Sequence, residues 1–150
     1  MAATARKLPF AGLLITTVLL AGDQQAEIRS QLSDVGSALT GSNPADAMTP
    51  FSKSFPDYNK LRNYFTGLTS AFSIVNEIDV LDEADTDKDS TATVRWTITL
   101  SNGPVSGNGT QRAADIHVRF VREKGKWKIV EFSPIDLFDP AQAQTAKPAS

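Results

Sequence analysis

Hydrophobic residues recur with the period of an α-helix in the segment that begins at residue 24. Between residues 24 and 40, four apolar residues are spaced by three or four positions: Ile28, Leu32, Val35 and Leu39. Residues at this spacing share one face of a helix and can pack against a core. The pattern therefore predicts an amphipathic helix over residues 24–40.

Two further helices are predicted before any strand. Asn43 can cap the free amides of a helix and Pro44 suits its first turn, so a short helix carrying Met48 and Phe51 is expected there. After Pro56, aromatic and aliphatic residues again recur at every third or fourth position: Tyr58, Leu61, Phe65, Leu68 and Phe72. This second stripe predicts a longer third helix.

Beyond residue 72 the pattern changes from helical to alternating, which is typical of half-buried strands. In residues 91–100, apolar residues alternate with Thr and Arg: Ala92, Val94, Trp96, Ile98 and Leu100. Similar alternation occurs in residues 74–80, 114–121 and 127–132. The sequence therefore predicts four strands in one antiparallel sheet.

The order of these elements resembles that of a known family. Three helices precede long antiparallel strands, which close with the turn and strand Gly125, Lys126, Trp127, Lys128 and Ile129. This arrangement, over roughly residues 24–138, resembles the NTF2-like superfamily, which includes the SnoaL-like and ketosteroid-isomerase-like proteins. The resemblance implies an α+β fold in which a curved sheet wraps the helices as a cone, often with a ligand pocket inside. Homodimers are common in this family, and its functions range from enzymes to binding modules.

The first 22 residues have the features of a secretory signal peptide. Arg6 and Lys7 precede an apolar run from Leu8 to Gly22 that is shorter than a membrane-spanning helix requires. Residues 19–22 resemble the box before the lipidated cysteine of bacterial lipoproteins, but Asp23 stands in place of that cysteine. We therefore expect a bacterial protein exported to the periplasm or the medium, without a stable membrane anchor after cleavage.

Charge and cysteine content narrow the possible functions. The formal charge is −2, and it becomes −4 when Arg6 and Lys7 are removed, because 13 basic and 17 acidic residues remain. Nucleic-acid binders usually carry an excess of basic residues, so we predict no nucleic-acid partner. The chain has no cysteine, which excludes disulfides, thiol nucleophiles and cysteine-ligated metals.

The alternation in the strands also predicts which side chains face a pocket. If the apolar sides of the strands turn toward the helices, five residues are candidates to line a pocket for a small apolar ligand: Tyr64, Trp96, Ile98, Phe120 and Trp127. Ordinary core packing is the competing interpretation for each of them. Arg95, Asp115, His117 and Arg119 would then face away from the helices.

Catalysis of the ketosteroid-isomerase type needs a carboxylate base and a hydrogen-bond acid inside an apolar cavity. By alternation Glu131 shares a strand face with Trp127 and Ile129, whereas Val130 and Phe132 share the other face. Both faces carry apolar residues, so the sequence leaves the direction of Glu131 open. A pair formed by Glu131 and Tyr64 is the alternative to a domain without catalytic residues. Because the strands supply mostly apolar inward positions, we favour a non-catalytic binding or interaction module over an isomerase, cyclase or hydratase.

No cofactor or metal site is predicted. The acidic run of residues 82–89 begins like a calcium-binding loop, but counted from Asp85 its sixth and twelfth positions are Ser90 and Trp96 instead of Gly and Glu. This run is better explained as a solvated hairpin turn. His117, the single histidine, lies two residues from Asp115 on one strand and has no nucleophile motif beside it, so we interpret it as a surface or dimer contact.

Together these patterns predict three segments: a signal peptide (1–22), one NTF2-like domain (23–138) and a disordered tail (139–150). The tail consists mainly of Ala, Gln, Pro and Thr and has little to bury. The Thr-rich outer face of the sheet, with Arg95 and Arg119, is the predicted homodimer contact.

Overall fold

The computed structural model describes residues 23–102 and 109–145. Residues 1–22, which were predicted to be a signal peptide, lie outside these ranges, as do residues 103–108 and the end of the predicted tail after residue 145. None of the helices in the described ranges is both long and apolar enough to cross a bilayer.

The three predicted helices are present and precede the sheet. The N-terminal helix is helical from residue 23, where the described chain begins, to residue 40. The short helix α2 (Pro44–Ala47) begins as predicted, because the Asn43 side chain accepts a hydrogen bond from the Asp46 amide at 3.2 Å. Met48 and Phe51 were both predicted to lie on this helix. Met48 is its C-cap residue, and Phe51 lies beyond it in a single β-bridge with Ile129. The third helix, α3, spans Tyr58–Ala71.

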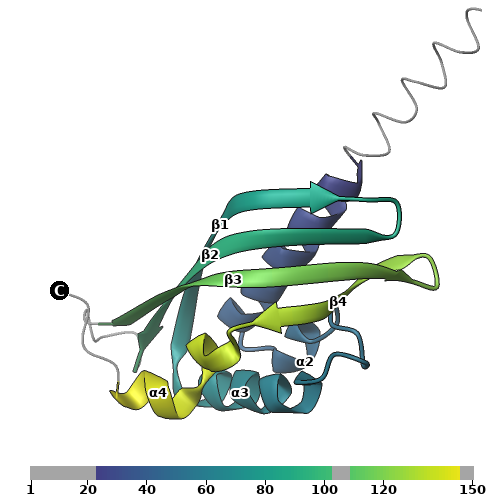
Figure 1. The fold of residues 1–150 in the computed structure, drawn as a ribbon. Coiled ribbons are helices and arrows are strands. Elements are labelled where there is room, and N and C mark those ends of the chain that lie inside the picture. The colour runs from purple at the N-terminus through teal and green to yellow at the C-terminus, as the bar shows by residue number, and fades with distance from the viewer. Residues whose placement is uncertain (1–22, 103–108, 146–150) are drawn as a thin grey trace, which may run out of the picture.

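Four antiparallel strands follow in the order of the sequence, which confirms the predicted α+β architecture. They are β1 (Ser73–Asp85), β2 (Asp89–Ser101), β3 (Thr110–Glu123) and β4 (Lys126–Ser133), and each pairs with the next. Figure 1 shows the sheet curving around the helices, which all lie against one of its faces. Lys124 and Gly125 both have positive φ, as a tight turn between two strands requires, and they join β3 to β4.

The C-terminal segment is more ordered than predicted. Residues 139–145, expected in a disordered tail, instead continue from the 3-10 helix η1 (Ile135–Phe138) into the helix α4 (Pro140–Thr145). Arg112 on β3 holds this segment, since its guanidinium donates to the carbonyls of Leu137 and Asp136 at 2.8 and 3.1 Å. Partial burial lowers the pKa of Arg112. The ordered domain therefore extends past residue 138.

One hydrophobic core joins the helices to the concave face of the sheet. The N-terminal helix contributes the predicted stripe, and Ile28, Leu32, Val35 and Leu39 are at most 2% exposed. The inward side chains of β2 alternate along its whole length, as its burial pattern shows. The period-two and helical patterns of the sequence thus identify the buried faces correctly.

Candidate functional site

The residues predicted to line an internal pocket lie in the core. Trp96, Ile98, Phe120 and Trp127 are fully buried, and Tyr64 is half-buried against the same cluster. None of the five lines either of the two cavities described below.

Aromatic side chains fill the interior of the cone around Trp96. Phe138 meets the Trp96 ring edge to face, with centroids 5.5 Å apart, and meets Phe65 in the same way at 5.2 Å. Phe132 approaches Trp96 from β4 at 5.8 Å. Phe138 comes from η1, a segment that the sequence patterns did not predict. The space where the resemblance implied a ligand pocket is therefore occupied by side chains, which include Phe138 from the C-terminal segment.

Glu131 and Tyr64 are not brought together inside the cone. A register shift between Arg119 and Phe120 on β3 leaves Val130 unpaired on β4. The bulge turns Glu131 outward, and its side chain is 64% exposed, 3.6 Å from the guanidinium of Arg119. Tyr64 lies on α3, where the Lys60 ammonium stands 5.8 Å from its ring centroid. The direction of Glu131 that the sequence left open is thus decided by a bulge.

The convex face of the sheet carries the charged side chains that were predicted to face outward. Arg95 donates to Asp115 at 2.9 Å, and Arg119 donates to Asp89 at 2.8 Å. The hydrogen bond from Arg95 lowers the pKa of Asp115, and the same bond raises the pKa of Arg95. The exposed His117 ring has Thr93 as its partner, at 3.1 Å. These groups form cross-strand pairs and no catalytic array.

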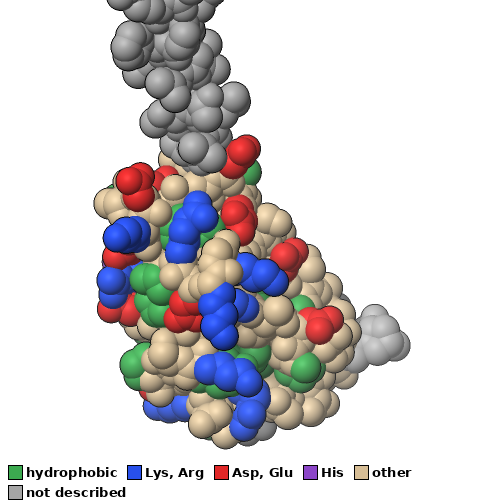
Figure 2. Space-filling view, turned by 90° about the vertical axis from the view of Figure 1, so that its right-hand side faces the viewer, with side chains coloured by type: hydrophobic (Ala, Val, Ile, Leu, Met, Phe, Trp, Pro, Cys, Tyr) green, Lys and Arg blue, Asp and Glu red, His purple; other side chains and the backbone are tan. Residues whose placement is uncertain are grey.

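Acidic and basic residues are unevenly divided between the two hairpins. Residues 77–89 contain seven acidic residues and Lys88, whereas residues 122–128 contain four basic residues and Glu123. In the view of the face near the hairpin ends, Lys and Arg side chains form a band down the middle, with Asp and Glu scattered around it (Figure 2). The acids of the β1–β2 hairpin are partly engaged: Glu83 pairs with Arg29, Asp85 accepts from Ser90 and Asp89 pairs with Arg119. In the described ranges, no three His, Asp or Glu side chains are grouped to hold a metal ion.

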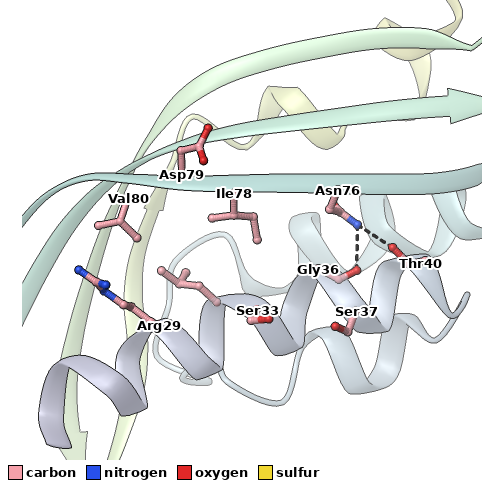
Figure 3. Close-up of a pocket in the computed structure, with 10 residues that line it drawn as sticks. Arg29, Ser33, Gly36, Ser37, Thr40, Asn76, Ile78, Asp79 and Val80 are labelled. Carbon is pink, nitrogen blue, oxygen red and sulfur yellow. Dashed lines mark hydrogen bonds between the residues drawn. The ribbon is translucent and has the colours of Figure 1, made fainter.

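A groove of about 670 Å³ runs between the N-terminal helix and β1. Figure 3 shows the helix lying along this strand, with Asn76, Ile78 and Val80 pointing from the strand toward the helix. The helix wall carries polar residues at one side of the helix: Arg29, Ser33, Ser37 and Thr40. The strand wall is formed by Asn76 and residues 78–80, and Leu32 adds apolar surface from the helix.

Gly36 allows the helix to approach β1 closely at this groove. A Cβ atom on Gly36 would lie 3.2 Å from Ile78 Cδ1 and 3.4 Å from Asn76 Cβ, so a side chain at this position would force these neighbours to shift slightly. Asn76 uses this proximity to donate to the Gly36 carbonyl at 2.8 Å and to Thr40 Oγ1 at 3.1 Å. Its Oδ1 accepts the indole N–H of Trp96 at 2.9 Å. One amide thus links the floor of the groove to the core.

The groove offers hydrogen bonds without an acid–base pair. The Asp79 carboxylate points away from the helix in Figure 3, whereas Ile78 and Val80 point toward it. Arg29 is engaged by Glu83 at 2.9 Å, and the hydrogen bond between them raises the pKa of the guanidinium. Apart from Asp79 and Arg29, the groove is lined by hydroxyl groups, one amide and aliphatic surface. Such a lining can hold a ligand but supplies no group positioned for proton transfer.

Sequence reasoning overlooked this groove, although two signals were present. Ser33, Ser37 and Thr40 are spaced by four and three residues and so share one side of the helix. Asn76 occupies an inward position between Ile74 and Ile78, where a polar side chain needs a partner. The patterns do not show that the helix side and the strand edge meet.

A second cavity, of about 500 Å³, lies between the segment 48–54 that follows α2, the start of α3 and the β3–β4 hairpin. Its floor contains Ser52, which is 3% exposed and donates to Glu123 Oε2 at 2.7 Å. Ser54 Oγ lies 2.8 Å from Ser52 Oγ. A serine and a carboxylate without an imidazole do not make a nucleophilic triad, and His117 is on the convex face of the sheet.

Comparison with known proteins gives similarity of fold. No family model matches the chain, and the search of curated proteins also found no match. Among solved structures, an NTF2-like protein with a cystatin-like fold from Novosphingobium aromaticivorans has a TM-score of 0.61 at 12% identity, over 79% of this chain and 84% of that one. An NTF2-like protein of unknown function from Shewanella oneidensis has a TM-score of 0.57 at 7% identity, over 73% and 96%. A protein of unknown function from Mycobacterium tuberculosis has a TM-score of 0.63 at 13% identity, over 77% and 72%.

Proposed function

The chain has the NTF2-like fold, and on this premise we propose that it is an exported, non-catalytic binding module whose binding site is the groove between the N-terminal helix and β1. The observation that carries this proposal is that the candidate catalytic carboxylate and the open groove lie in different parts of the domain. The carboxylate best placed by sequence for catalysis, Glu131, is 64% exposed on the convex face, while aromatic rings fill the cone. The open groove has hydroxyl and amide groups but no inward carboxylate.

The lining suits a compact ligand or segment with apolar and hydrogen-bonding parts. Leu32, Ile78 and Val80 supply aliphatic surface, and Ser33 and Ser37 supply hydroxyls that can donate or accept. Binding sites of this size are usually apolar with a few placed polar groups. The fold alone does not select among functions, so the proposal depends on this site.

The two tryptophans allow a direct test by NMR. Trp96 is connected to the groove through Asn76, whereas Trp127 is buried and its indole N–H has no hydrogen-bond partner among the described residues. We would titrate the ¹⁵N-labelled protein with 2-naphthol and with cyclohexanol. Occupation of the groove should shift the Asn76 side-chain amide and the Trp96 indole and leave the Trp127 indole in place. Shifts of both indoles without a change at Asn76 would place the ligand in the cone and contradict the proposal.

A pair of serine variants provides the matched control. Ser33→Phe places a ring in the groove, and Ser30→Phe makes the same change on an exposed residue of the same helix that does not line the groove. The first variant should abolish the shifts at Asn76, and the second should retain them. Equal binding by both variants, or no shifts with either probe at millimolar concentration, would refute the groove as a binding site.

A further inference from the structure

β1 is an edge strand, and the groove follows it. In the described sheet β1 pairs with β2 alone, so its other edge is open. Alternate residues of an antiparallel strand direct their N–H and C=O groups toward each side, so half of those in β1 point to this open edge. Residues 76–80 span about 13 Å at the rise of a strand, enough for roughly four or five residues of an added one.

The exposed apolar residues point to the same strand. Among the described residues, the large hydrophobic side chains that remain exposed are Val75, at 62%, and Leu81, at 53%. Both belong to β1, one on each side of the groove segment. A strand added at the open edge would cover part of both, because side chains on neighbouring strands contact one another.

The charge of β1 defines what could pair with it. The strand contains five acidic residues and no basic residue. Glu83 and Asp85 have partners in Arg29 and Ser90, whereas Glu77, Asp79 and Asp82 form no ion pair in the described part of the chain. A second copy of this strand would set like charges opposite one another, which is destabilising. The edge is complementary to a basic segment instead.

We propose that the open edge of β1 and its groove bind an extended, basic segment of a partner protein as a fifth strand. Side chains alternate across a strand, so basic residues would face Glu77 and Asp79 on the convex side. The residues between them would be apolar and enter the groove beside Ile78 and Val80. Backbone hydrogen bonds give affinity in this binding mode, and alternate side chains give selectivity. The inference rests on the proposed function and identifies the occupant of its site.

Synthetic peptides test this inference directly. The probe is a fluorescein-labelled octapeptide in which Val alternates with Lys, and the control replaces each Lys with Glu. Fluorescence anisotropy with the purified protein should show binding of the basic peptide only, weakening as salt is raised. N-methylation of one alternate set of amides should abolish binding, because that set pairs with β1, whereas methylation of the other set should preserve it. A basic peptide that binds equally well with either set methylated would overturn strand pairing.

Charge variants test the surface. Glu77→Lys should weaken the binding of the basic peptide by roughly tenfold, because it replaces attraction by repulsion at an exposed position. Asp136→Lys makes the same change on the exposed η1 residue and should leave affinity unchanged. Equal weakening by both variants, or by neither, would overturn the proposed edge. If naphthol still shifts Asn76 while no peptide binds, the groove remains a binding site and only the peptide inference fails.

Discussion

Trp96 donates its indole N–H to Asn76 Oδ1 at 2.9 Å, which joins the centre of the core to the wall of the groove. Asn76 also holds the N-terminal helix through the Gly36 carbonyl. The first prediction concerns this link. Asn76→Leu should lower the free energy of unfolding by about 1–3 kcal/mol, because it leaves the buried Trp96 N–H unpaired. Urea denaturation measures the change, and Asn63→Leu on the exposed side of α3 should alter stability by less than about 0.5 kcal/mol. Equal losses would contradict the role of the link.

The ring of Phe138 closes the cone, so its removal should be costly. Phe138→Ala is expected to destabilise the domain by about 3–5 kcal/mol, because it removes a buried ring that contacts Trp96 and Phe65 and leaves a cavity. Leu81→Ala also removes a large apolar side chain, but from an exposed position, and should have little effect on unfolding. A loss below about 1 kcal/mol for Phe138→Ala would indicate that η1 is not packed as described.

Gly67 on α3 lies against Pro140 of α4. A Cβ atom at Gly67 would stand 2.6 Å from Pro140 Cγ, closer than packed atoms allow. Ala favours a helix over Gly by about 0.5–1 kcal/mol, but we expect the clash to outweigh this gain and Gly67→Ala to lower the melting temperature. In a Pro140→Ala background the same substitution should become neutral or stabilising. A higher melting temperature for the single variant would show that α4 does not pack on α3.

The Arg95–Asp115 pair should make stability depend on pH at the acid end. The hydrogen bond from Arg95 lowers the pKa of Asp115 below its ordinary 3.8. A carboxyl group whose pKa is lower in the folded state stabilises the protein at pH values above its unfolded-state pKa. This stabilisation is lost as the pH falls through its folded-state pKa. Asp115→Asn should therefore reduce stability at pH 6, and the reduction should shrink as the pH falls below 3.8. In an Arg95→Gln background the substitution should have little effect on stability at pH 6, and a loss of the same size in that background would exclude this pair as its cause.

We propose that the convex face pairs with a second copy of the chain. Arg95 and Arg119 are already paired within one chain, so a dimer would depend mainly on the outward threonines of β2, which are Thr91, Thr93, Thr97 and Thr99. Analytical ultracentrifugation at micromolar concentration should give a dimer mass. Thr97→Lys at the centre of this face should give a monomer, while Thr66→Lys on α3 should remain dimeric. A wild-type monomer under these conditions would refute the dimer.

The elements whose side chains follow one period were predictable from the sequence. The stripe from Ile28 to Leu39 and the alternation from Ala92 to Leu100 both occur where hydrophobic burial alone sets the pattern. Residues 139–145 were predicted wrongly, because their order depends on distant partners such as Arg112 and Gly67 and not on their own composition. Local composition indicates disorder only where nothing elsewhere in the chain holds the segment.

The sequence by itself determined three helices before four antiparallel strands and the side of each strand that faces the core, because side-chain periodicity is a local property of the backbone. Only the tertiary structure decided the direction of Glu131, since a one-residue bulge reverses the alternation without a clear mark in the sequence. It also decided that Phe138 fills the cone and that the groove forms where Gly36 meets Asn76. Each of these depends on contacts between residues far apart in the chain, which no local pattern specifies.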